Sequence, residues 1–287
     1  MKKPSYPTLE PFNFLGLEKQ DYEKAKVIIF PVPYNSTTYW KSETKDGPRA
    51  IIEASRHLEL YDSELKKDPS RMGIFTLEQL EPSKASPEAT IARIKKVISQ
   101  LLQDRKFPMM IGGEHSITNG AIQAFRQKFS NFSILQIDAH TDSRDEFEGT
   151  KWHHACVMRR ARDFKIPVTQ VGIRSVSEEE AEYFKKKKIK SIFYAPDLPF
   201  NKIIATLKKN VYVTFDLDAL DPSIMPSVGT PEPGGLGWYE TLDLINAIAK
   251  KRKIIGADVV ELCPIPGISD PDFLAAKLVY KIISYIA

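Results

Sequence analysis

Short runs of β-branched and apolar residues alternate along the chain with longer segments of helical periodicity. This alternation is typical of a mainly parallel sheet with helices over both faces, because a crossover helix usually joins parallel strands. The expected strands are residues 26–31, 72–77, 107–113, 132–138, 167–173, 190–195, 210–218 and 253–262. The sequence therefore predicts an α/β fold.

The segments between the expected strands carry helix signals. Residues 86–104 begin with a capping Ser86 and a first-turn Pro87, and apolar residues then recur at helical spacing. Residues 46–60 read likewise as a helix. No low-complexity linker, composition break or internal repeat divides the 287 residues, so we predict one domain over residues 1–287. Residues 1–25, rich in proline and aromatic side chains, are expected to form an arm on the surface or on a neighbouring subunit.

Charge and cysteine content exclude several classes of protein. The net charge is only +4, and the basic run Lys185–Lys188 continues a Glu-rich helical segment, which indicates a solvated helix face. The sequence has no stripe of basic residues interleaved with aromatic residues, so we expect no nucleic-acid partner. The two cysteines, Cys156 and Cys263, show no CxxC spacing, which suits a reducing cytosol. No signal peptide or membrane-length apolar run is present in the sequence, so we expect a cytoplasmic protein without a membrane partner.

Carboxylates and imidazoles follow three of the expected strands, at the end where ligands bind in parallel sheets. They are His115 in "GGEHS", Asp138, His140 and Asp142 in "DAHTD", and Asp216 and Asp218 in "FDLDALDP". Four converging carboxylates without compensation would repel one another and have strongly raised pKa values. No matching Lys or Arg cluster accompanies them, so we predict a site for two divalent cations. Oxygen-rich ligation with some imidazole favours manganese or a similar ion over structural zinc.

Four motifs in this order, "GGEHS", "DAHTD", "TFDLDALDP" and "VGTPEPGGL", resemble the signature blocks of the ureohydrolases, the arginase and agmatinase family. "GPRAIIEAS" and "ADVVELCP" are also similar to agmatinase-like members, and the likeness extends over most of the chain. The resemblance implies a three-layer α/β/α fold with a mainly parallel eight-stranded sheet. It also implies a centre of two Mn²⁺ ions per subunit, which hydrolyses a guanidino group to urea and an amine.

The resemblance further implies the ligands of each ion. One ion would be held by His115, Asp138, Asp142 and Asp216, and the other by His140, Asp138, Asp216 and Asp218. Six side chains give each ion four protein ligands only if Asp138 and Asp216 are shared, and a further bridging position is left for water. Two cations would lower the pKa of that water and supply a nucleophile near neutral pH.

Three further residues are expected to act in catalysis. Asp142 would accept the hydrogen bond of the nucleophile and relay its proton, and Glu261 matches the family glutamate that grips the guanidinium. The leaving amine needs a proton donor, for which a histidine shuttle is expected. His153 and His154 lie side by side, and alignment on the following "ACVMRR" selects His154, with His153 as the alternative.

The substrate is inferred from the segment between "DAHTD" and these histidines. Asp145, Glu146 and Glu148 form an acidic set that favours an amine at the far end of the substrate, whereas Arg144 can pair with a carboxylate or with Asp145 or Glu148. Glu43 stands where many relatives have glycine, so the pocket can differ. We rank agmatine first, with putrescine and urea as products. N1-aminopropylagmatine, which gives spermidine and urea, comes second, and guanidino acids such as 4-guanidinobutyrate come third.

The residues expected to contact this small cationic substrate are Glu261, His154, Asp145 and Arg144. Two other classes compete with this interpretation. A deacetylase on a related fold would use a single zinc ion, which the full set of six ligands argues against. A non-catalytic homologue would typically have lost ligands, and none is missing. Family resemblance suggests a homo-oligomer, a trimer or a hexamer.

Overall fold

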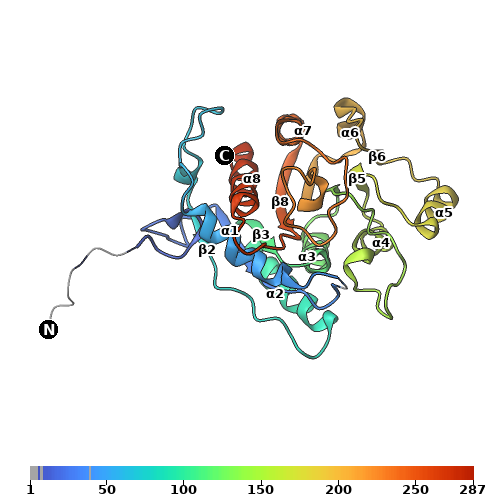
Figure 1. The fold of residues 1–287 in the computed structure, drawn as a ribbon, viewed down its shortest axis with the longest axis horizontal. Helices are drawn as coiled ribbons and strands as arrows, with labels where there is room; N and C mark the ends of the chain where they lie inside the picture. Colours follow the sequence, from blue (N-terminus) through green and yellow to red (C-terminus); the bar gives the residue numbers. More distant parts are fainter. Residues whose placement is uncertain (1–5, 7–8, 39) are drawn as a thin grey trace.

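A single all-parallel sheet of eight strands, in the order β2-β1-β3-β8-β7-β4-β5-β6, forms the centre of the computed structural model, which describes residues 6, 9–38 and 40–287 (Figure 1). The strands are β1 (Val27–Val32), β2 (Ile74–Thr76), β3 (Phe107–Gly112), β4 (Phe132–Ile137), β5 (Val168–Ile173), β6 (Ile192–Tyr194), β7 (Asn210–Asp216) and β8 (Lys253–Val260). Seven fall within the runs predicted from the sequence and β1 ends one residue beyond its run, so the α/β prediction is confirmed.

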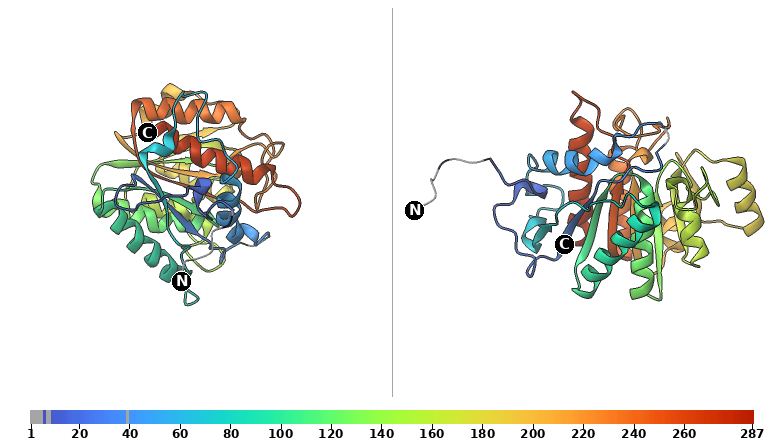
Figure 2. Two further views of the ribbon diagram at one scale, coloured as in Figure 1. Left: turned by 90° about the vertical axis from the view of Figure 1, so that its left-hand side faces the viewer. Right: turned by 90° about the horizontal axis from the view of Figure 1, so that it is seen from below.

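Helices cover both faces of this sheet (Figures 1 and 2). The α-helices are α1 (Gly47–Ser55), α2 (Pro87–Gln103), α3 (Thr118–Lys128), α4 (Val157–Asp163), α5 (Glu178–Lys187), α6 (Phe200–Thr206), α7 (Trp238–Lys251) and α8 (Asp270–Ile286). Short 3₁₀ helices are η1 (Phe14–Gly16), η2 (Glu43–Asp46), η3 (Pro69–Met72), η4 (His115–Ile117), η5 (His154–Cys156) and η6 (Leu217–Ala219). One apolar cluster joins α1, α6, α7 and α8 to one face, and a second joins α2, α3 and α4 to the other.

Alternation along the strands explains the two layers of core. Ile29 of β1 belongs to one cluster, and its neighbours Ile28 and Phe30 belong to the other. Side chains of successive residues point to opposite faces of a strand, so a strand buried on both faces is apolar throughout. The three-layer arrangement therefore follows from near-continuous apolar runs rather than from alternation with polar residues.

Local capping fixes the helices that the sequence predicted. Ser86 accepts a hydrogen bond from the amide of Ala89 at the start of α2, which then buries Ile94 against the sheet and α3. Helix α1 ends at Ser55, five residues before the predicted end, where the chain turns over residues 56–58 and their amides donate to carbonyls three residues back. The basic run Lys185–Lys188 is exposed, as expected.

The predicted arm, residues 1–25, lies partly outside the described residues, which omit 1–5, 7 and 8 of it. Its later part packs on this chain: Phe14 and Leu15 are buried, and their amides donate to the hydroxyls of Thr76 and Ser55. Among the helices of the described residues, none has the length and apolar character that crossing a membrane requires.

Candidate active site

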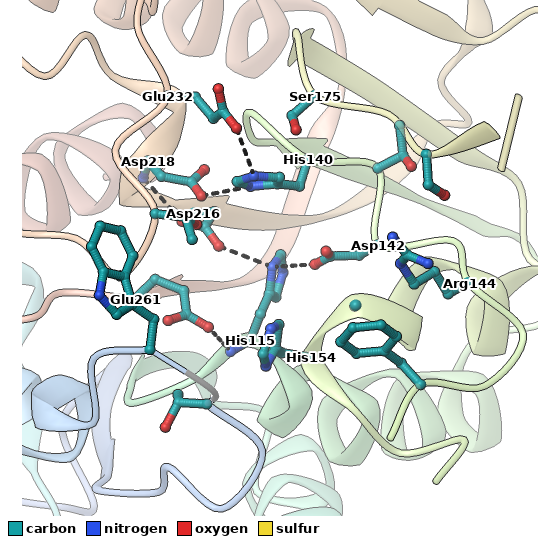
Figure 3. Close-up of a pocket in the computed structure, with 18 of the residues that line it drawn as sticks. His115, His140, Asp142, Arg144, His154, Ser175, Asp216, Asp218, Glu232 and Glu261 are labelled. Carbon is teal, nitrogen blue, oxygen red and sulfur yellow. Dashed lines mark hydrogen bonds and ion pairs between the residues drawn. The ribbon is translucent and has the colours of Figure 1, made fainter. Parts of the chain in front are cut away.

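The predicted site residues meet beyond the carboxyl ends of β3, β8, β7 and β4, which are neighbours at the middle of the sheet. Except for Asp138 and Asp145, they line a cavity of about 260 Å³ (Figure 3). We call the cluster of His115, Asp138, His140, Asp142, Asp216 and Asp218 the floor; five of the six line the cavity, and Asp138 is fully buried beside them. We call the outer wall of the cavity the rim, which consists of Trp40, Arg144, Phe147 and Glu232.

His115 anchors one half of the floor. It begins η4 directly after β3, where Gly113 lets two backbones pass, since a Cβ there would lie 1.9 Å from the carbonyl oxygen of Tyr34. Its Nδ1 lies 2.9 Å from Asp142 Oδ2 and 3.2 Å from both Asp138 Oδ2 and Asp216 Oδ2. This buried nitrogen has no hydrogen-bond partner among the described residues. A lone nitrogen among three carboxylate oxygens is the donor set of a cation site.

His140 anchors the other half. Its Nδ1 lies 2.8 Å from Asp218 Oδ2 and 3.7 Å from Asp138 Oδ1. Ligand atoms converge in two groups of residues, and within each group these atoms lie no more than 4.8 Å apart. The first group is His115, Asp138 and Asp142, and the second is Asp138, His140 and Asp218. Asp138 belongs to both groups and uses a different oxygen toward each histidine, so the floor has the shape of two adjoining cation sites.

The pKa values of the floor report its unbalanced charge. Burial, together with repulsion from Asp218 and Asp142, raises the pKa of Asp138 to about 8, and burial and Asp218 raise the pKa of Asp216 as well. Burial lowers the pKa of His140, but the charge and hydrogen bond of Asp218 together with the charges of Asp138 and Asp142 outweigh it and raise that pKa to about 11. Without a cation the cluster therefore retains protons. Divalent cations would supply the same positive charge, so the donor set fits two metal ions.

The backbone is strained at two residues of the site, Glu261 and Asp142. Glu261, which follows β8, has φ of 67°, and Asp142 has φ of 46°, in the left-handed region that residues other than glycine rarely adopt. The amide of His115 donates to Glu261 Oε1 at 2.6 Å, which ties the carboxylate to the floor. Burial and the charge of Glu114 raise the pKa of Glu261 well above its usual value. A cationic ligand would offset the negative charge that is buried on the Glu261 carboxylate.

The two adjacent histidines have different surroundings. His154 lines the cavity, whereas His153 is buried outside it, where its Nδ1 accepts from the amide of Ala155 and its ring lies edge-on to Phe147. His154 Nδ1 lies 3.1 Å from the hydroxyl of Thr37. Burial, with neighbouring histidines, lowers the pKa of His154 to about 3. The structure thus brings His154, and not His153, to the cavity.

The acidic segment expected at the substrate does not reach the cavity as a set. Asp145 is directed away to Arg160, whose Nη2 donates to Asp145 Oδ1 at 2.7 Å, and Asp145 is not among the lining residues. Glu148 lies 3.6 Å from His153 Nε2, and Glu146 is exposed. Arg144 does line the cavity.

The partners of Arg144 also differ from those expected. Its guanidinium stacks over Phe147 at 4.7 Å and lies 3.9 Å from Glu179, rather than bridging Asp145 or Glu148. Glu43 contacts Cys263 Sγ and does not line the cavity.

Glu232 lines the cavity, although the sequence did not predict it as a site residue. Its Oε1 lies 3.7 Å from His140 Nε2, on a loop whose flanking prolines limit its motion and whose carbonyl accepts from Arg174. The charged residue between two prolines in "TPEPGG" was the available signal. Asp221 anchors the same loop by accepting from the amides of Gly234 and Gly235.

Comparison with known proteins identifies the class. Residues 25–284 match the model of the arginase family, and the chain belongs to this family and is a metal-dependent ureohydrolase. Its His and Asp groups are typical of the binuclear manganese site of that family.

Individual relatives are similar over nearly their whole length. The chain is 39% identical over 298 residues to the N(1)-aminopropylagmatine ureohydrolase of Synechocystis sp., covering 99% of this chain and 97% of that protein. It is 33% identical over 265 residues to the agmatinase of Halalkalibacterium halodurans, covering 91% and 92%. The solved structure of the agmatine ureohydrolase of Thermoplasma volcanium superposes with a TM-score of 0.87 at 33% identity, covering 97% of this chain and 94% of that one.

Proposed function

We propose that this chain hydrolyses the guanidino group of N1-aminopropylagmatine to give spermidine and urea. The observation that carries the chemistry is one cavity that combines the His and Asp floor with Glu261 and His154. The choice of substrate is supported by relatives of that name in Synechocystis sp., Thermus thermophilus and Thermococcus kodakarensis, at 39%, 36% and 31% identity. This reverses the order expected from the sequence, which placed agmatine first.

In this proposal the six floor residues hold two manganese ions, with Asp138 and Asp216 shared. The ions would supply Lewis-acid chemistry, activating water for attack on the guanidinium carbon. Asp142 orients that water and takes its proton. Asp138 is fully buried and belongs to both groups of converging ligand atoms, which supports its role as a shared ligand.

Glu261 is proposed to bind the guanidinium. Its Oε1 is engaged by the amide of His115, and its Oε2 faces the cavity, 4.0 Å from where a Cβ of Gly229 would lie. The cation of the substrate would offset the buried negative charge that raises the pKa of this carboxyl. Glu261 thereby holds the planar group against the floor.

His154 is proposed to move protons between the reacting groups and solvent. Thr37 donates its only hydroxyl proton to Glu114 Oε1 at 2.7 Å, so it can only accept from His154 Nδ1. The proton of the neutral ring then lies on Nδ1, and Nε2 is free to take up a proton. With its lowered pKa the ring is neutral near pH 7, and once protonated it would release its proton readily to the leaving amine.

The rim supports a polyamine tail. Trp40 lines the cavity and is 66% exposed, and its ring already has the ammonium of Lys41 5.4 Å from its centroid, a contact in which the indole binds a cation. Glu232 offers a carboxylate with its side chain 36% exposed. Agmatine is the second candidate, favoured by the agmatinase relatives. Arg144 and Lys41, which both line the cavity, favour a guanidino acid, whereas the stacking of Arg144 on Phe147 and its proximity to Glu179 weigh against that role for Arg144.

The experiment that tests the proposal measures urea release by the manganese-loaded protein. N1-aminopropylagmatine, agmatine, 4-guanidinobutyrate and arginine are compared, with a chelated sample as control. We expect the highest kcat/KM with N1-aminopropylagmatine and none after chelation. A higher kcat/KM with agmatine would return that substrate to first place, and no urea from any compound by the metal-loaded protein would overturn the function.

We also propose a homo-oligomer, a trimer or hexamer, acting in the cytoplasm. Exposed aromatic side chains, Tyr61 at 57%, Tyr239 at 70% and Phe273 at 44%, are candidates for covered surface. Light scattering coupled to size-exclusion chromatography tests this directly, and a monomer would contradict it.

A further inference from the structure

Asp258 is a fully buried carboxylate on β8 that does not line the cavity. Three hydroxyl groups donate to it: Thr214 to Oδ1 at 2.5 Å, and Tyr212 and Thr118 to Oδ2 at 2.6 and 2.9 Å. A group that accepts three hydrogen bonds on its two oxygens is suited to the ionised form, because an ionised carboxylate only accepts. The proposed chemistry gives Asp258 no task.

Thr214 connects Asp258 to the floor. Its hydroxyl oxygen lies 2.8 Å from Nε2 of His115, on the far side of the ring from the three floor carboxylates. A threonine hydroxyl has one proton and two lone pairs. Since that proton points to Asp258, Thr214 can only accept from the imidazole, and Nε2 must therefore carry a proton.

The consequence falls on the other ring nitrogen. A neutral imidazole has a single N–H, so a proton held on Nε2 leaves Nδ1 with a free lone pair. Nδ1 is buried, has no hydrogen-bond partner in the part of the chain that the structure describes, and lies 2.9 to 3.2 Å from three carboxylate oxygens. The alternative tautomer would place a proton where a cation should sit.

We propose that Asp258, acting through Thr214, is a positioning residue that keeps the proton of His115 on Nε2 and so presents Nδ1 to the metal ion. This inference rests on the proposed metal centre. It concerns one half of the floor, because His140 has no matching arrangement among the described residues. Its Nε2 lies 3.7 Å from Glu232, which is beyond hydrogen-bond distance.

The chain offers a matched control for the test. Thr118 and Thr214 both donate to Asp258 from buried positions, but only Thr214 contacts His115. Thr→Val is nearly isosteric at either position, so Thr214→Val and Thr118→Val remove the same group from Asp258. Thr214→Ser keeps the hydroxyl. Asp258→Asn lets an amide donate to Thr214, which then can donate to Nε2 and favour the wrong tautomer.

The first readout is the affinity for Mn²⁺ alone, measured as free ion by electron paramagnetic resonance in metal-depleted protein. Loss of an outer hydrogen bond to a ligating histidine typically weakens metal binding about 10- to 100-fold. We expect that loss at one of two sites in Thr214→Val and Asp258→Asn, near-native affinity in Thr118→Val, and recovery in Thr214→Ser. Equal losses in the two valine variants would indicate a packing effect and overturn the inference, as would native affinity in Thr214→Val.

The second readout is the tautomer itself. The chain has five histidines, so ¹⁵N-histidine spectra of protein loaded with diamagnetic Cd²⁺ are tractable. We expect a protonated Nε2 and a metal-bound Nδ1 for His115 in the native protein and in Thr118→Val. A metal-bound Nε2 or a protonated Nδ1 in the native protein would overturn the inference. Native protein that binds two Mn²⁺ ions but releases no urea would overturn the proposed function alone.

Discussion

The floor and the rim of the cavity are built differently. The floor residues extend from the ends of central strands, and Asp138, 0% exposed, shares its two oxygens between two histidines. The rim residues lie on loops, and Trp40 is 66% exposed. A side chain at the end of a buried strand has its position set by the sheet, whereas a loop side chain depends on its neighbours. In the proposed function, we therefore expect the floor to determine the reaction and the rim to determine the substrate.

The largest effect is expected from the centre of the floor. Asp138→Asn should lower urea release by about 10³-fold or more, because loss of a shared ligand removes charge stabilisation worth several kcal/mol. Asp145→Asn is the matched control, since that carboxylate pairs with Arg160 outside the cavity. The measurement is kcat/KM with manganese present. A similar loss of kcat/KM in both variants would contradict the distinction between the floor and its surroundings.

The paired histidines give the next effect. His154→Asn should lower kcat by about 10²- to 10⁴-fold, the usual contribution of a general acid or base. His153→Asn keeps an acceptor for the amide of Ala155 and should change kcat little. Added imidazole should restore part of the activity of the first variant. A larger loss in His153→Asn would transfer the shuttle role to that residue.

The floor should also make the metal-free protein sensitive to pH. Asp138, with a pKa of about 8, and His140, with a pKa of about 11, bind more protons when folded than when unfolded between pH 7 and 9. Stability therefore falls as pH rises through this window, by a few degrees in Tm, because the unfolded chain has already released protons that the folded protein still holds. Mn²⁺ should remove most of this slope. A metal-free Tm that rises from pH 7 to 9 would contradict it.

The smallest effect is expected at the rim. Glu232→Gln should raise KM for N1-aminopropylagmatine by about 5-fold, since a partly exposed ion pair contributes up to about 1 kcal/mol. The KM for 4-guanidinobutyrate should stay unchanged or fall, and kcat should change little for either substrate. An equal loss of kcat for both substrates would place Glu232 with the floor, acting through His140.

Local sequence was sufficient for the sheet and for the inner residues. Each strand is a short apolar run, and the "DAHTD" motif directly follows β4, so Asp138 and His140 could be placed without knowing the fold. The rim could not be predicted in the same way. Asp145 pairs with Arg160 on α4, and no pattern around Asp145 in the sequence indicates that partner. Glu232 reaches His140 from a distant loop.

The choice between His153 and His154 also depends on how the chain packs. Adjacent residues leave a turn in different directions, and only packing decides which one faces the cavity. The polar chain from Asp258 to His115 also joins β8, β7 and η4, so it becomes visible only when these segments are brought together.

Strand β8 is the last strand along the chain, yet it lies between β3 and β7 at the centre of the sheet. During synthesis the earlier strands emerge first, and their core positions stay open until residues 253–260 are inserted. Because β8 lies between β3, which His115 follows, and β7, which ends at Asp216, the floor residues converge only after that strand has left the ribosome. With the proposed metal centre, metal capture would be a late event in the biogenesis of this protein.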